Sequence, residues 1–162
     1  MAVDTVAPFA VVAYIEDGAW QVGVLPERLA EDLDGLIAAL RQQPGEGATL
    51  GLVNVAGDFF VATRLQGGRV RLLLSDVTAA VAWPLAGQVV QRLGIPVPSE
   101  DELDDVWPAG DLSIFADLGM DEMELGAVLA DLDAFADEML TAIAARLGFG
   151  DPFERALDAA AR

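Results

Sequence analysis

Carboxylates are the only reactive side chains that this chain carries in quantity. It has 27 aspartates and glutamates but no histidine, cysteine or lysine, and all nine of its basic residues are arginines. Three serines, five threonines and a single tyrosine, Tyr14, complete the set. Carboxylates alone can hydrolyse glycosides or hold a magnesium ion for hydrolysis. Any enzymatic interpretation therefore depends on carboxylates, serines, threonines, Tyr14 and arginines, and these two reactions are examples of what carboxylates can do.

The missing side chains exclude most other sites. Without His and Cys there is no zinc site of the usual kind, no haem or iron–sulfur ligation and no disulfide. Without Lys there is no Schiff base and no P-loop lysine, and without His there is no Ser–His–Asp triad. Acid–base catalysis near neutral pH most often uses His. We therefore expect a protein that is not an enzyme and holds no cofactor and no metal.

Three short motifs partly resemble known ligand-binding motifs but lack the residues or the context that those motifs require. The acidic run at residues 100–105 lacks the alternating ligands and central glycine of a calcium-binding EF-hand loop. Gly45, Gly47 and Gly51 miss the dinucleotide-binding spacing and precede a strand rather than a helix. Ser75 and Asp76 stand where a helix begins, so we expect them to cap it. Only three or more acids converging in a cleft would restore a carboxylate–metal enzyme.

The net charge of −18 is concentrated in the second half of the chain. Residues 1–99 carry ten acids and six arginines, whereas residues 100–162 carry 17 acids and three arginines. Such a surface repels phosphates, so we expect no direct nucleic-acid binding and favour a basic protein partner. Fourteen acids between Glu100 and Glu138 have no basic neighbour in sequence. Like charges raise one another's pKa, so we expect mild acid to leave stability unchanged or increase it.

No segment indicates export or membrane insertion. The first residues lack the basic region of a signal peptide. The longest uncharged stretch, residues 77–91, is too short to span a bilayer and contains Pro84. We expect a cytoplasmic protein that does not bind membranes.

The elements that must position these side chains follow from periodicity. Residues 8–16 and 20–24 form a predicted hairpin around Asp17-Gly18, and a helix is expected over 26–42. Strands at 49–55, 59–65 and 69–74 are joined by short turns, and a second helix over 77–93 follows, with a kink expected at Pro84. The order ββ-α-βββ-α predicts an α+β domain, residues 1–93, whose mostly antiparallel sheet carries helices on one face.

The remainder is predicted as a linker and a helical region. Residues 94–110 are rich in proline and acids, with Val106 and Trp107 expected to attach them to the body. Residues 111–162 form an acidic helical region packed on the first domain. It begins with a short helical turn at 111–118 and ends with a helix at 152–161. Between them one long helix is expected from Glu122 to Leu147, capped by Asp121.

The long helix supplies the candidate partner surface. Its apolar stripe, to which Leu132 and Phe135 belong, is wider than one packed face requires. Glu124, Asp131 and Glu138 recur at heptad spacing and form an acidic ridge on the outside. We take these three carboxylates as a possible docking face for a basic protein, with an ordinary solvated surface as the alternative. No residue is assigned a catalytic, cofactor-binding or metal-binding role.

Several segments together resemble a known family. They are the hairpin with Trp20, the segments VRLLLSDVTAA (residues 70–80) and GDLSIFADLGM (110–120), and the helix end AARLGF (144–149). In these the chain resembles the tRNA adenosine deaminase-associated proteins. The family is named for lying beside the gene of the deaminase that converts adenosine to inosine in tRNA. That enzyme needs zinc held by His and Cys, so the resemblance implies at most an accessory of it.

Two further functions stay open beside the accessory. The accessory would bind a tRNA adenosine deaminase or another basic tRNA-handling protein through its acidic half. The main alternative is a self-associating structural protein, unrelated to tRNA editing, that uses the long helix as a homodimer seam. The carboxylate–metal enzyme is the third.

Overall fold

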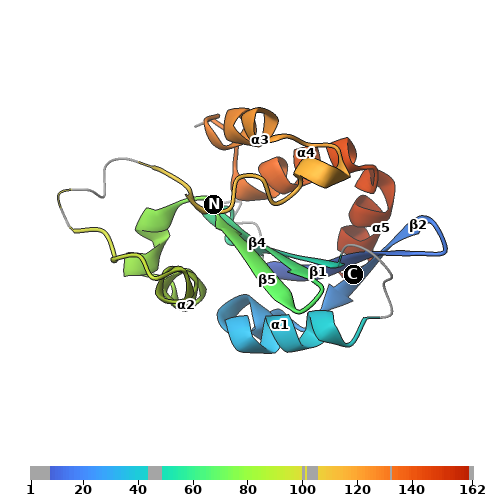
Figure 1. Ribbon diagram of the computed structural model, residues 1–162, viewed down its shortest axis with the longest axis horizontal. Coiled ribbons are helices and arrows are strands. Elements are labelled where there is room, and N and C mark those ends of the chain that lie inside the picture. The colour runs from blue at the N-terminus through green and yellow to red at the C-terminus, as the bar shows by residue number, and fades with distance from the viewer. Residues whose placement is uncertain (1–7, 44–48, 100, 102–105, 132, 161–162) are drawn as a thin grey trace, which may run out of the picture.

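The structure is a computed structural model that describes residues 8–43, 49–99, 101, 106–131 and 133–160. Its centre is a six-stranded antiparallel sheet with the strand order β2-β1-β3-β4-β5-β6 (Figure 1). The strands are β1 (Phe9–Glu16), β2 (Ala19–Leu25), β3 (Thr49–Val55), β4 (Phe59–Gln66), β5 (Arg69–Leu74) and β6 (Ala109–Gly110). The helices are α1 (Leu33–Arg41), α2 (Pro84–Leu93), α3 (Glu122–Leu129), α4 (Ala136–Leu147) and α5 (Gly150–Ala160), with 3₁₀ turns η1 (Glu27–Glu31), η2 (Val77–Val81) and η4 (Ala116–Leu118).

The sheet is the middle of three layers. Successive side chains of a strand point to opposite faces of the sheet, and in its central strands the side chains on both faces are apolar and buried. Val53, Val55 and Val61 belong to a core with α1 and α2. Leu52 and Phe60, their neighbours on the same strands, belong to a second core with α3, α4 and α5. Figure 1 shows the two groups of helices on opposite sides of the sheet. The predicted α+β class is confirmed, and the first two helices share one face as expected.

All five long strands were predicted from the sequence. Asp17 and Gly18 turn the first hairpin with φ angles of 53° and 78°, which is the conformation that an Asp-Gly pair favours in a tight turn. The sixth strand was not predicted. It lies within the segment interpreted as a linker, where Gly110 pairs with Leu73 and Ala109 with Leu74.

Two predicted helices begin with a separate 3₁₀ turn. Residues 27–31 form η1, and α1 starts only after Asp32, whose carboxylate accepts a hydrogen bond from the Gly35 amide at 3.0 Å. Asp76 caps η2 in the same way, as predicted, through the amide of Thr78. The kink expected at Pro84 is a complete break, because proline favours the first position of a new helix.

The single long helix predicted over residues 122–147 is wrong. Asp121 and Glu124 do form a capping box, but α3 ends at Leu129. The Asp131 carboxylate then accepts a hydrogen bond from the amide of Asp133, a local turn that competes with helix. A new helix, α4, starts at Ala136. The Glu138 carboxylate caps its first turn by accepting a hydrogen bond from the Phe135 amide at 2.9 Å. Three predicted features lie outside the described residues. They are Leu132 of the apolar stripe, residues 44–47, which were expected to end the first helix, and most of the acidic run at 100–105.

Gly110 is the position at which backbone geometry most restricts the sequence. Its φ is +108°, and a Cβ there would stand 2.3 Å from the carbonyl oxygen of Leu72. We expect Gly110→Ala to lower the free energy of unfolding by about 1–2 kcal/mol from the backbone conformation and by about 1–3 kcal/mol more from the clash. Urea unfolding measures the loss.

The matched control is Gly68→Ala, because Gly68 also has a positive φ, +80°, but open space around it. This variant should show the backbone cost alone. An equal loss in both variants would contradict the close approach between β6 and β5.

Candidate functional site

Two arginines, Arg64 buried and Arg71 partly buried, attach the C-terminal region to the sheet. Arg64 on β4 and Arg71 on β5 stand opposite each other. Arg64 is 3% exposed and donates to the carbonyl oxygen of Ile114 at 2.8 Å and to both carboxylate oxygens of Asp117 at 2.5 and 2.8 Å. Arg71 donates to the Asp111 carboxylate at 2.6 Å and to the Ser113 carbonyl oxygen at 2.8 Å. We call these contacts the arginine clamp, and they hold residues 111–117 against the sheet.

The clamp lowers the pKa of both of its carboxylates. Hydrogen bonds from Arg64 hold the pKa of Asp117 below its ordinary value of 3.8. For Asp111, burial acts to raise the pKa, but hydrogen bonds from Arg71 and Ser113 outweigh it and lower the pKa. The prediction that acids of this region raise one another's pKa is therefore wrong for these two residues. A charged hydrogen-bond donor stabilises a carboxylate more than distant like charges destabilise it.

The predicted ridge of Glu124, Asp131 and Glu138 is not a ridge on one helix. Glu124 lies on α3 and accepts hydrogen bonds at 2.6 and 3.2 Å from Arg146 on α4, which lower the pKa of Glu124. Asp131 lies in the connection between the helices, and Glu138 lies in the first turn of α4. The fold nevertheless brings Asp131 and Glu138 to the rim of one hollow, which Glu124 does not line.

Acidic and apolar side chains meet where α3 turns into α4. Two hollows of about 220 and 440 Å³ lie side by side there, and Asp131 and Met139 line both. Phe135 stands beside them with 64% of its surface exposed, so its predicted place in an apolar core stripe is wrong. We call this region the α3–α4 surface; it comprises Asp58, Asp76, Val106, Val128, Asp131, Ala134, Phe135, Glu138 and Met139. None of the residues that line the two hollows is basic.

The tight turn between β3 and β4 contacts the start of α4 beneath this surface. Ala56 and Gly57 follow β3 with φ angles of 55° and 76°. The Gly57 carbonyl oxygen accepts a hydrogen bond from the Ala136 amide at 3.0 Å, so it meets the first residue of α4. A Cβ on Gly57 would contact Phe135 and Asp137. The exposed position of Phe135 is thus set by the β3–β4 turn together with the Glu138 cap.

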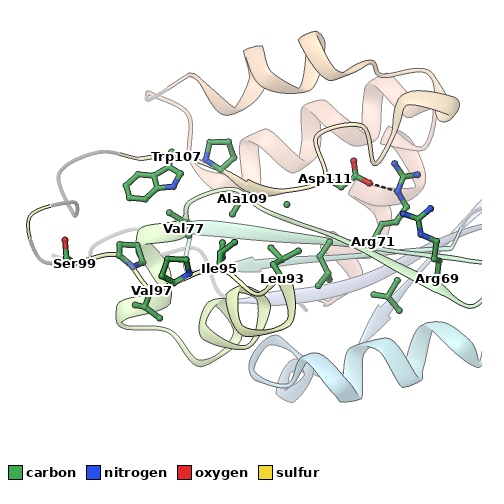
Figure 2. Close-up of a pocket in the computed structure, with 16 residues that line it drawn as sticks. Arg69, Arg71, Val77, Leu93, Ile95, Val97, Ser99, Trp107, Ala109 and Asp111 are labelled. Carbon is green, nitrogen blue, oxygen red and sulfur yellow. Dashed lines mark hydrogen bonds and ion pairs between the residues drawn. The ribbon is translucent and has the colours of Figure 1, made fainter.

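A larger pocket lies elsewhere, along the edge of the sheet (Figure 2). It is a groove of about 760 Å³ between residues 93–99 and residues 107–111. Most of these residues were predicted as a linker, so the groove was not expected from the sequence. Trp107 is attached to the body as predicted, since its carbonyl oxygen accepts the Val77 amide at 2.8 Å. Val106 is 52% exposed, so the prediction that it does the same is wrong.

The described residues lack two other kinds of feature. No group of three or more acidic side chains converges there in a way that could hold a metal ion. None of the described helices is long and apolar enough to cross a membrane. The two candidate sites in the described part of the molecule are the α3–α4 surface and the groove.

Comparison with known proteins identifies the family. The model of the Rv3753c-like tRNA adenosine deaminase-associated protein family matches residues 8–150. The chain belongs to the tRNA adenosine deaminase-associated proteins. It is 35% identical over 158 residues to Protein Rv3753c of Mycobacterium tuberculosis, an alignment that covers 97% of this chain and 91% of that protein. No solved structure matches.

The family resemblance proposed from the sequence is confirmed by this match. Two of its motifs, residues 70–80 and 110–120, carry Arg71, Asp111, Ser113 and Asp117 of the arginine clamp. The motifs that identify this tRNA adenosine deaminase-associated protein therefore belong to the part of the fold that docks its C-terminal region onto the sheet.

The lowered pKa of Asp117 gives stability a dependence on acid. A carboxylate whose pKa is lower in the folded chain stabilises the fold above its unfolded pKa, near 3.8, and this contribution is lost as pH falls through the folded value. We expect the free energy of unfolding to fall between pH 5 and the acid limit of the fold, and to fall less in Asp117→Asn. Urea unfolding at a series of pH values measures both. Identical pH profiles for the two chains would contradict a stabilising Arg64–Asp117 pair.

Proposed function

We propose that this chain is a non-catalytic accessory protein that binds a tRNA adenosine deaminase through its α3–α4 surface. The observation that carries the proposal is the exposed Phe135 beside apolar hollows with an acidic rim, in a chain of this family. Interfaces of this kind combine a central aromatic anchor with a charged rim that guides the partner.

The residue set supports a role without catalysis. Deamination of adenosine uses zinc held by His and Cys, with a Glu that moves the proton. This chain has neither His nor Cys, so it acts on the deaminase rather than as one. The acidic half also disfavours direct contact with tRNA, whose phosphates it repels.

Charge complementarity favours a basic, RNA-handling partner. Asp58, Asp76, Asp131 and Glu138 line the two hollows, and Asp133 is exposed next to them. Among the described residues, Asp131 and Glu138 have no basic partner, whereas Glu124 is paired with Arg146. Asp131 and Glu138 are therefore the partner-facing acids, and Glu124 contributes by joining α3 to α4.

A homodimer through the same surface is less favourable. A two-fold interface pairs the same surface patch of both copies, so the acidic patch that contains Asp131 and Glu138 would face a second acidic patch. The continuous long helix that suggested a dimer seam is absent from the structure. A basic partner removes the repulsion that a second copy creates.

The carboxylates can be tested without disturbing the local turns. Asp131→Asn with Glu138→Gln keeps the oxygen atoms that accept the Asp133 and Phe135 amides but removes two charges. We expect this double variant to associate more slowly with the purified tRNA adenosine deaminase at low salt, and the difference to shrink as salt rises. Surface plasmon resonance measures the rates. The matched control is Glu154→Gln with Asp158→Asn, two exposed acids on α5. Equal slowing in both double variants would contradict the assigned surface.

Phe135 is the expected anchor of the complex. Phe135→Ser should change the stability of the isolated chain by only about 0.5 kcal/mol, because the side chain is largely exposed. It should weaken binding to the deaminase by about tenfold, the effect of losing about 1.4 kcal/mol at an interface hot spot. Met123→Ser is the control, since Met123 is 85% exposed outside the two hollows. Failure of the parent chain to bind the deaminase at low salt would refute the proposal.

A further inference from the structure

The groove at the sheet edge is a second binding surface, on other residues than the α3–α4 surface. Figure 2 shows Arg69 and Arg71 at one end of it and Trp107 and Ser99 at the other. Between them the lining is mostly apolar and comes from β5, from the end of α2 and from the proline-containing segment after it.

One wall of the groove is a strand edge that β6 covers only in part. β6 pairs with Leu73 and Leu74 alone, and the last contact is the hydrogen bond from the Asp111 amide to the Leu72 carbonyl oxygen at 2.8 Å. Alternate residues of a strand direct their backbone groups to the same side. The N–H and C=O groups of Val70 therefore face the same way as the Leu72 carbonyl, beyond the end of β6, with no strand beside them among the described residues.

The end of this open edge carries a cation without a counterion. Arg69 is exposed, and no carboxylate of the described residues lies within ion-pair distance of it. Arg71, two residues on, is already engaged by Asp111. In a chain of net charge −18, a basic group held at the mouth of an apolar groove complements a carboxylate.

We propose that the groove binds an extended peptide segment of a partner protein, which adds to the open edge of β5. Backbone hydrogen bonds to Val70 hold the segment, its alternate apolar side chains fill the groove, and an acidic side chain pairs with Arg69. Peptides bind exposed sheet edges in this way, with main-chain bonds supplying affinity and pockets supplying specificity. Single-stranded RNA fits less well, because among the described lining residues only Arg69 is a cation free of a carboxylate.

The experiment selects linear nonapeptides from a phage-displayed random library against the full chain, and titrates the best synthetic peptide by fluorescence anisotropy. We expect alternating apolar residues with at least one acid. Arg69→Glu should weaken binding tenfold or more, whereas Arg155→Glu, the same charge change on an exposed residue of α5, should change it less than twofold. N-methylation of the peptide at one set of alternate residues should abolish binding, and at the other set should leave it within twofold.

Three results would overturn the proposal. The first is that no selected peptide depends on Arg69, and the second is that N-methylation at every position has the same effect. The third is that a mixed-sequence single-stranded RNA, and not peptides, binds in an Arg69-dependent manner. The outcome is independent of the deaminase experiments, because Phe135, Asp131 and Glu138 do not line the groove.

Discussion

A buried arginine is the constraint from which much of this fold follows. Arg64 sits in the middle of the sheet, where an unpaired charge is strongly destabilising. Among the described residues, its two terminal amino groups donate to the Ile114 carbonyl oxygen and the Asp117 carboxylate, about fifty residues further along the chain, while its Nε has no partner. The chain after β6 must therefore cross the sheet at this place. That crossing fixes where α3 begins and commits the C-terminal helices to the face opposite α1 and α2.

The groove and the α3–α4 surface, the two regions proposed to bind partners, both follow from that arrangement. The same crossing draws residues 107–111 along β5, where they cover part of its edge and form one wall of the groove. On the other side, α4 is placed so that its first residue meets the β3–β4 turn. Phe135 lies at the surface there, between acidic residues. The arginine clamp thus helps to position both the groove and the α3–α4 surface.

Local patterns in the sequence predicted the sheet well and the C-terminal half less well. Alternation and turn residues such as Asp17-Gly18 are short-range signals, and the strands they indicated are present. The break between α3 and α4 depends on the hydrogen bond from Ala136 to Gly57, about eighty residues apart, which periodicity cannot detect. The Glu138 side chain, three residues after Phe135, was a local signal of a new helix start that the heptad pattern obscured. Of the three predicted partner residues, Asp131 and Glu138 do share a surface, although not for the helical reason that suggested them.

We propose that a tRNA adenosine deaminase binds at the α3–α4 surface. Hydrogen–deuterium exchange of the full chain, alone and with saturating deaminase, tests it most directly because it locates the contact without any substitution. If the deaminase binds at the α3–α4 surface, we expect slower exchange at amides within residues 128–139 and in the β3–β4 turn, and no change in the exposed turns of α5. Unchanged exchange in that region at saturation, or protection confined to α1 and α2, would contradict it.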